Sequence, residues 1–368
     1  MKSKRKRIAL LTAGMAVLLI FSIVFNVLSV AKFDNIFEKA LGATPFRLKG
    51  NTLGADVDYY KSDFNSASEL YAYEEAKVAE IVQEGATLLE NNGVLPLAQG
   101  TELSVFSVSS VDLVSGGSGS GSGSFELTKD LKAGLENAGL VVNEDLWNFY
   151  KKYFKDHKYK LPFDPDSAKH VRGKGVINYG ADLDWSINEC PLSNITGDQA
   201  LVDSFEGTVA MFVLSRTGGE GGDEPRDMAA FGGEVGQHYL EPDKTELEII
   251  SYLNDNFDDV IILVNCNNAI ELGWVEDYEN ISAVINFPGG GRTGTYGLGY
   301  MMTGLDANGV EISASGHLVD TWVYDNFSSP AMQNMGDFRF SGTKYYYVNY
   351  SEGIYVGYRY YETRYEDA

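Results

Sequence analysis

The sequence predicts an α/β fold, in which a mostly parallel sheet carries helices on both faces and is preceded by one transmembrane helix. Three apolar runs are typical of buried strands, at residues 208–214, 260–264 and 283–287. Segments with helical spacing of apolar residues accompany them, at 66–84, 127–138 and 246–256. Strands that alternate with helices indicate a parallel sheet covered on both sides, an α/β sandwich.

Local signals support the individual elements. The helix expected at 66–84 places Tyr71, Val78 and Ile81 near one face. Residues 104–109, SVFSVS, have the pattern of a further strand. Before the helix at 246–256, Asp243 and Glu246 have the spacing of a capping box, which predicts where that helix begins.

The N-terminus combines a basic cluster with a long apolar run. Five of the first seven residues are Lys or Arg, and the apolar run covers residues 8–31. This pattern predicts a cytoplasmic segment at 1–7 and a transmembrane signal anchor at 8–31. A stalk or wrapping segment at 32–65 and the α/β domain at 66–368 would then lie outside the cytoplasm. The alternative is a signal peptide that is cleaved, which would release a secreted protein.

Composition narrows the classes of ligand. The chain has 368 residues, 44% hydrophobic and 22% charged, so a sizeable globular core is expected. Its formal net charge of −23 argues against nucleic acid as a partner and favours neutral ligands. Two cysteines, Cys190 and Cys266, are too few for a disulfide scaffold, and their pairing stays open. Neither a metal nor an organic cofactor is implied.

Three loops follow expected strands, and ligands of open α/β sheets bind beyond the carboxyl ends of strands. Residues 116–124 are a Gly/Ser run that could cradle a phosphate or could be a flexible loop. In residues 215–224, Glu220 lies between glycines. This pattern is typical of a proton donor on a mobile loop, and equally of a solvated acidic turn. Residues 288–292 could contact a ligand through the backbone or allow close packing of the next helix.

Seven segments follow one another in a characteristic order. The first three are 84–91 (EGATLLEN), 116–123 (GGSGSGSG) and 215–223 (SRTGGEGGD). The others are 264–274 (VNCNNAIELGW), 288–290 (PGG), 315–322 (SGHLVDTW) and 352–361 (EGIYVGYRYY). In this order they resemble the α/β-sandwich domain of glycoside hydrolase family 3, which includes β-glucosidases; the first three match its opening motif, its glycine-rich loop and its acid/base loop. The resemblance covers roughly residues 66–365.

The resemblance implies a retaining two-carboxylate mechanism acting on a β-linked oligosaccharide or glucoside. Glu220 matches the family's general acid/base, which protonates the departing oxygen and then deprotonates water. Arg216 and Asp223 match recurrent neighbours and are expected to support the loop or to bind substrate. Glu224 stands where an arginine is common in the family.

The same resemblance implies that the aspartate nucleophile belongs to a (β/α)₈ barrel domain. Neither this barrel nor a fibronectin-III-like domain is recognisable in the 368 residues. We therefore expect the chain to be the front part of an enzyme with reversed domain order, with the barrel acting in cis or in trans. Alone, it should have little or no activity.

Two other interpretations remain open. The first is a carbohydrate-binding or scaffold module that kept the fold and lost the chemistry. The segment 344–365, which holds nine of the 23 tyrosines, could then stack on sugar rings instead of forming a domain interface. The second is a nucleotide-binding domain, which predicts anion binding at 116–124.

Overall fold

The structure is a computed structural model. This structure describes residues 2–28, 62–116, 128–157, 160–161, 164–168, 185–218, 223–336, 340 and 342–364. The chain divides into two compact units, Met1–Asn65 and Ser66–Ala368.

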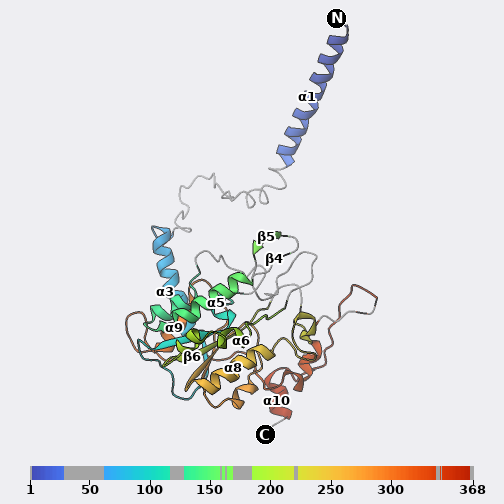
Figure 1. Ribbon diagram of the computed structural model, residues 1–368. Helices are drawn as coiled ribbons and strands as arrows, with labels where there is room; N and C mark the ends of the chain where they lie inside the picture. Colours follow the sequence, from blue (N-terminus) through green and yellow to red (C-terminus); the bar gives the residue numbers. More distant parts are fainter. Residues whose placement is uncertain are drawn as a thin grey trace, which may run out of the picture. The chain divides into compact units, whose positions relative to one another are not determined.

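In the first unit, helix α1 covers Lys2–Leu28 (Figure 1). The apolar run at 8–31 is therefore helical as far as Leu28, and residues 29–31 lie outside the described residues. Among the residues that the structure describes, no helix is both long enough and apolar enough to cross a lipid bilayer. The transmembrane helix expected at 8–31 is thus not supported. Of the expected stalk at 32–65, only residues 62–65 are described.

A six-stranded sheet forms the centre of the second unit, in the order β1-β8-β7-β6-β2-β3. Strands β3, β2, β6, β7 and β8 run parallel, and β1 pairs antiparallel with β8 at the edge. The strands are β1 (Thr87–Asn91), β2 (Glu102–Phe106), β3 (Val141–Val142), β6 (Val209–Arg216), β7 (Val260–Cys266) and β8 (Ile281–Asn286). A separate two-stranded sheet joins β4 (Lys160–Leu161) to β5 (Asp164–Ala168).

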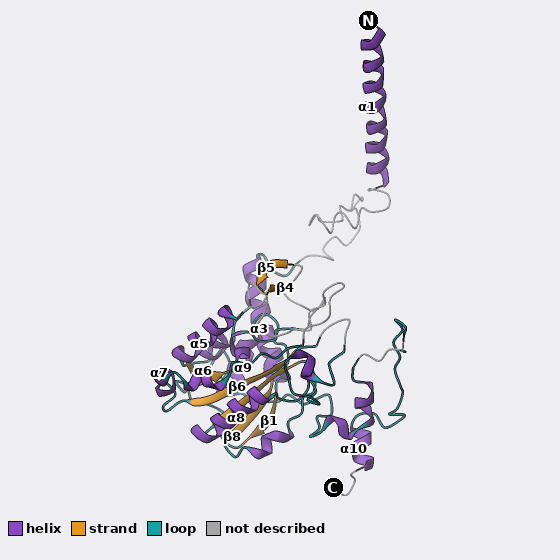
Figure 2. Ribbon diagram, turned by 45° about the vertical axis from the view of Figure 1, so that its right-hand side comes forward, coloured by secondary structure: helices purple, strands orange, loops and turns teal. Residues whose placement is uncertain are grey.

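Helices cover both faces of the six-stranded sheet, as the sequence predicts (Figure 2). Successive strand residues point to opposite faces, so Phe212 packs on one side and Met211 on the other. One layer contains α5 (Glu144–Asp156), α6 (Leu192–Thr196), α7 (Gln199–Asp203) and α8 (Lys244–Asn256). The other contains α3 (Ala67–Gly85), α4 (Leu131–Asn137) and α9 (Gly294–Thr303). Helix α10 (Tyr358–Arg364) lies near the C-terminus.

Helices α4 and α9 approach each other closely because glycines lie at their contact. A Cβ atom on Gly299 would lie 2.3 Å from the backbone oxygen of Gly134. A side chain at either position would force the helices apart. A Cβ atom on Gly134 would likewise clash with the backbone of Thr295, so the close packing extends to the first turn of α9.

Two expected elements differ from the observed ones. The strand expected at 104–109 ends at Phe106, because Ser107 adopts a φ of 89° and a 3₁₀ helix follows over Val108–Val111. The helix expected at 127–138 begins at Leu131, after Asp130 caps it by accepting from the backbone N–H of Ala133. The capping box of α8 is present as its spacing predicts.

Both cysteines are buried, and no disulfide joins them. Cys266 lies at the end of β7, with its Sγ 3.5 Å from the backbone oxygen of Leu214. Burial raises the pKa of the Cys190 thiol to about 12, and the nearby Glu189 carboxylate adds to this effect. Such a thiol is not poised to act as a nucleophile.

Candidate active site

The candidate site lies where the direction of chain connection reverses in the sheet. In the sheet, β2 lies between β3 and β6. The chain runs from β2 to β3 in one direction across the sheet, and from β6 to β7 in the opposite direction. The loops that follow β2 and β6 therefore diverge at their carboxyl ends, and such switch points form ligand crevices in open α/β sheets. The loop at 215–224 starts at this point.

Arg216, the last residue of β6, is 1% exposed, and its five N–H groups are all used. Nε donates to the backbone oxygen of Tyr239 at 2.7 Å. Nη1 donates to the backbone oxygen of Ser215 and to Glu246, at 2.9 and 2.8 Å. Nη2 donates to the backbone oxygen of Glu241 and to Glu246, at 2.8 and 2.6 Å. The guanidinium thus anchors the loop and has no donor left for a substrate.

The acceptor Glu246 belongs to the first turn of α8 and is 1% exposed. Its Oε2 also accepts from the backbone N–H of Asp243, whose own carboxylate caps the helix. Burial lowers the pKa of the Arg216 guanidinium, but the nearby Glu246 carboxylate has the larger effect, so the pKa is raised overall. Burial and the charge of Glu246 together raise the pKa of Asp243 from 3.8 to about 6. A buried ion pair therefore ties β6 to α8.

Tyr239 holds the next residue of the loop. Its hydroxyl accepts from the backbone N–H of Thr217 at 3.1 Å, and its ring lies 5.6 Å from the guanidinium carbon of Arg216. The Tyr239 ring packs edge-on against Trp185. These two rings belong to a small core with Met228, Ile187, Met332 and Met335. The loop after β6 is therefore supported by an apolar cluster separate from the main core.

The other end of the loop is held at Asp223 and Glu224. Oδ2 of Asp223 accepts from the backbone N–H of Gly336 at 2.9 Å. Asn268, which follows β7, donates from its side-chain amide to Oε1 of Glu224. Burial raises the pKa of Glu224, and the charge of Asp223 raises it further. Glu220 itself, the expected acid/base, lies outside the described residues.

Asn265 connects loops that sequence patterns treat separately. At the end of β7, its Oδ1 accepts from the Val114 backbone N–H at 2.7 Å and from the Ser215 hydroxyl at 2.9 Å. Its Nδ2 donates to the backbone oxygens of Val114 and Phe287, at 3.0 and 3.1 Å. One amide thus joins β6 to the loops after β2 and β8. The only signal in the sequence is an asparagine that ends an apolar strand.

Glu189 was also not singled out from the sequence. It is buried below the turn after β2, where it accepts from the Ser107 hydroxyl at 2.6 Å and the Val108 N–H at 2.9 Å. Its Oε1 also accepts from the Cys190 N–H at 2.7 Å. Burial raises the Glu189 pKa from 4.5 to about 7, although these hydrogen bonds lower it. This carboxyl holds Ser107 in a conformation that is strained for any residue except glycine.

The other two loops are described to different extents. Of 116–124, only Gly116 lies within the described residues. In 288–292, a Cβ atom on Gly290 would lie 2.4 Å from the Phe287 ring, and one on Gly289 would lie 3.0 Å from the Gly116 backbone. Close packing is thus reason enough for glycine at both positions.

Within the described part of the chain, His238, Glu241 and Glu271 bring three possible metal-ligand atoms within 4.8 Å of one another. The backbone N–H of Leu240 donates to Nδ1 of His238 at 3.1 Å, so the proton of the neutral ring belongs on Nε2. Nε2 lies 3.0 Å from Oε1 of Glu271 and can donate to it. A metal at Nε2 would require Nδ1 to carry the proton, which the Leu240 contact opposes. The cluster fits a hydrogen-bonded link between two loops better than a metal centre.

Comparison with known proteins places these features in a family. Residues 86–358 match the family model described as the C-terminal domain of glycosyl hydrolase family 3. A curated beta-glucosidase of Ruminococcus albus is 32% identical over 289 residues, which cover 78% of this chain and 26% of that protein. Beta-glucosidase A of Butyrivibrio fibrisolvens is 27% identical over 305 residues, covering 77% of this chain and 32% of that protein.

Solved structures share the fold. A beta-glucosidase of Paenibacillus barengoltzii has a TM-score of 0.59 and 27% identity, over 78% of this chain and 28% of its own. Beta-glucosidase 3B of Thermotoga neapolitana, solved with α-D-glucose, has a TM-score of 0.59 and 23% identity. That match covers 78% of this chain and 35% of the Thermotoga protein. The chain thus spans about a quarter to a third of the length of these proteins.

The first prediction concerns the anchor of the loop. Arg216→Met leaves Glu246 buried without its cation, and breaking such a pair costs about 3–5 kcal/mol. Urea unfolding followed by tryptophan fluorescence should show a loss of this size. Lys77→Met, at an exposed pair with Glu80, is the control and should leave the midpoint unchanged. A similar midpoint for both variants would contradict the role of Arg216.

The second prediction concerns pH. The Glu189 carboxyl keeps its proton up to about pH 7 in the folded protein but loses it near 4.5 when unfolded. Folding therefore takes up a proton in this window, so the free energy of unfolding falls as pH rises through it and is level above it. Glu189→Gln removes this titration. Between pH 5 and 7 the wild type should lose stability relative to Glu189→Gln, and parallel curves would contradict the prediction.

Proposed function

The chain belongs to glycosyl hydrolase family 3, and on that premise we propose that it supplies the acid/base half of a retaining β-glucosidase site. The two curated relatives named as beta-glucosidases support this choice of substrate class. The observation that carries the proposal is the anchoring of the loop that contains Glu220. A proton donor must be held in a productive position to act in catalysis. Arg216, at the start of this loop, donates five hydrogen bonds, which fix it to Glu246 of α8 and to backbone oxygens of residues 215, 239 and 241.

Glu220 has two tasks in this proposal. In the first step, a carboxylate nucleophile attacks the anomeric carbon while Glu220 gives its proton to the departing glycosidic oxygen. In the second step, Glu220 takes a proton from water, which attacks the same carbon and releases the nucleophile. In retaining enzymes the two carboxyl groups lie about 5–5.5 Å apart.

Arg216 and Asp223 act as supporting residues in this scheme. The donors of Arg216 are used within the protein, and Asp223 holds the far end of the loop through the backbone of Gly336. Asp223 and Glu224 also place negative charge three and four residues after Glu220. Negative charge nearby favours the protonated form of a carboxyl group, which a general acid requires.

The nucleophile is proposed to come from a barrel domain, in cis or in trans. The curated relatives are three to four times as long as the part they share with this chain, which spans 26% and 32% of them. The two-carboxylate reaction needs neither a metal nor an organic cofactor. The substrate would then be a β-linked glucoside or oligosaccharide bound between the two domains.

A carbohydrate-binding module is the second candidate function, and exposed aromatic side chains favour it. Tyr345, Tyr346, Tyr350 and Tyr358 are each more than half exposed. Aromatic faces of this kind can pack on the apolar faces of sugars. The same side chains would serve equally well as an interface for another domain.

For localisation, we propose that the residues after 32 are exported. A basic cluster followed by an apolar run is typical of an export signal. Cell fractionation combined with mass spectrometry of the N-terminus should find the protein outside the cytoplasm, either cleaved near Ala31 or intact. Recovery of the intact chain in the cytoplasmic fraction would refute this proposal.

The test of the catalytic proposal is hydrolysis of aryl β-glucosides by the full chain, with and without a barrel domain from a family member of the same domain order. Activity should require the barrel. Glu220→Gln should then lower kcat by about 10²–10⁴-fold. The loss should be larger for poor leaving groups, because these depend most on protonation.

Glu80→Gln, which changes an exposed carboxylate of α3 outside the loop, is the control and should keep the activity. Equal losses for good and poor leaving groups would contradict a general-acid role for Glu220. Activity of the chain without a barrel would mean that it contains its own nucleophile. Sugar binding without hydrolysis, even with the barrel, would favour the carbohydrate-binding module.

A further inference from the structure

Tyr239 contacts the chain on both sides of Glu220. Its hydroxyl accepts from the backbone N–H of Thr217 at 3.1 Å and can donate to the backbone oxygen of the same residue at 3.3 Å. Its own backbone N–H donates to the oxygen of Pro225 at 3.1 Å. Because Thr217 precedes Glu220 in the sequence and Pro225 follows it, one residue joins the two ends of the loop.

We propose that Tyr239 is a positioning residue for the proton donor of the reaction. By joining Thr217 to Pro225, it holds the loop so that Glu220 can reach the departing glycosidic oxygen. This inference rests on the acid/base role proposed above for Glu220. With only 2% of its surface exposed, Tyr239 acts through the loop and not on the substrate.

The hydroxyl group suits the Thr217 end of the loop. Strand β6 ends at Arg216, so its ladder of hydrogen bonds with β7 does not include Thr217. Thr217 is 4% exposed, and buried backbone groups need partners within the protein. A hydroxyl can accept from the N–H and donate to the C=O of the same residue. Tyr239 thus supplies hydrogen bonds where those of the sheet end.

Packing fixes the position of this hydroxyl. The centroid of the Tyr239 ring lies 5.0 Å from that of Trp185, with 70° between the two ring planes. Nε of Arg216 donates to the backbone oxygen of Tyr239 at 2.7 Å, which holds the main chain of the tyrosine as well. A side chain that is held in this way can keep its partner in one geometry.

The Pro225 end of the loop belongs to a turn that is closed on itself. Besides the bond between Tyr239 and Pro225, the N–H of Met228 donates to the oxygen of Gln237 at 2.7 Å. Oε1 of Gln237 accepts from the N–H of Glu234 at 2.9 Å. The separation of the two loop ends is therefore set by the protein before any substrate binds.

Asn268 supports the same arrangement from the segment after β7. A Cβ atom added to Gly218 would lie 3.4 Å from Oδ1 of Asn268, so this side chain lies beside the start of the loop. Its amide also donates to Glu224, at the other end. The two ends are thus brought together by two separate segments, which contain Tyr239 and Asn268.

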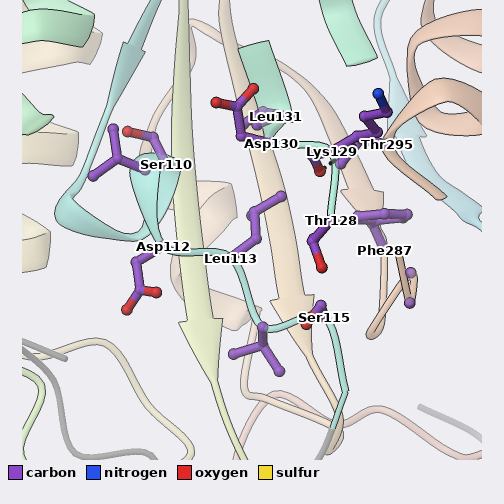
Figure 3. Close-up of a pocket in the computed structure, with 14 residues that line it drawn as sticks. Ser110, Asp112, Leu113, Ser115, Thr128, Lys129, Asp130, Leu131, Phe287 and Thr295 are labelled. Atoms are coloured by element: carbon purple, nitrogen blue, oxygen red, sulfur yellow. Dashed lines mark hydrogen bonds between the residues drawn. The ribbon is translucent and has the colours of Figure 1, made fainter. Parts of the chain in front are cut away.

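A cavity of about 190 Å³ is bounded by residues 110–115 after β2, residues 128–131 at the start of α4, the turn after β8 and Thr295 of α9 (Figure 3). Thr217, Pro225 and Tyr239 are not among the residues that line it. A substitution of Tyr239 should therefore leave this cavity unchanged, and its effect on activity can be assigned to the loop.

The test is Tyr239→Phe, which removes the hydroxyl and keeps the ring. In the full chain alone, the Thr217 amide should exchange its hydrogen for deuterium about tenfold faster, because its acceptor is lost. With the barrel domain added, kcat/KM should fall about tenfold for aryl β-glucosides with poor leaving groups, with little change in KM. For a dinitrophenyl β-glucoside, kcat/KM should stay within about twofold, because this leaving group needs no proton.

Tyr300→Phe is the matched control, since the Tyr300 hydroxyl accepts from Asn137 of α4, outside the loop. It should change neither the exchange of the Thr217 amide nor the dependence on the leaving group. Trp185→Phe is the second variant, for the case that Tyr239→Phe does not fold. It keeps the hydroxyl but loosens the packing of the Tyr239 ring, so it should give the same changes to a smaller extent.

The outcomes separate this inference from the acid/base proposal. Unchanged exchange of the Thr217 amide in Tyr239→Phe would overturn the role of Tyr239. Faster exchange without a selective loss for poor leaving groups would also overturn it, while a loss of activity in Glu220→Gln would still uphold the acid/base role. If the wild type has no activity with the barrel, or if Glu220→Gln is as active as the wild type, both proposals fail.

Discussion

The side-chain amide of Asn265 is the contact on which the carboxyl edge of the sheet depends. Its four hydrogen bonds reach Val114, Ser215 and Phe287, so β6 and the loops after β2 and β8 are tied to the end of β7. A neutral amide can do this inside the core because all of its hydrogen-bonding capacity is used. The anchored loop after β6 starts from one of the segments that this residue holds.

The loop after β6 is secured by a different kind of contact, a buried ion pair. Arg216 and Glu246 are each 1% exposed, and burying charges is costly unless each charge is paired and hydrogen-bonded. The capping box of α8 and the backbone oxygens of Tyr239 and Glu241 complete the pairing. Such a pair contributes a unique geometry more than it contributes stability. The pair fixes the position of the last residue of β6, from which the loop starts.

Local patterns in the sequence predicted strands β2, β6, β7 and β8 and helices α3, α4 and α8, but they missed β1, β3 and α5 as well as the turns. The spacing of Asp243 and Glu246 predicts a capping box because both partners lie in one turn of helix. Ser107, in contrast, continues an alternating pattern and ends the strand only because Glu189, far along the chain, holds it. Arg216 next to a glycine-rich loop is typical of a ligand-binding residue, and only its contacts with α8 indicate its supporting role. The four hydrogen bonds of Asn265 reach three separate segments, which no local pattern reveals.

The antiparallel pairing of β1 with β8 has a consequence for how the domain is made. Thr87 lies opposite Asn286, so the first strand of the sheet to be synthesised pairs with the last. Pairings between segments so distant in sequence form slowly, because a long loop must be closed first. On the ribosome, the edge of the sheet stays open until β8 has left the exit tunnel. Until then β1 is an unpaired strand, and the nascent domain depends on whatever shields that strand from other chains.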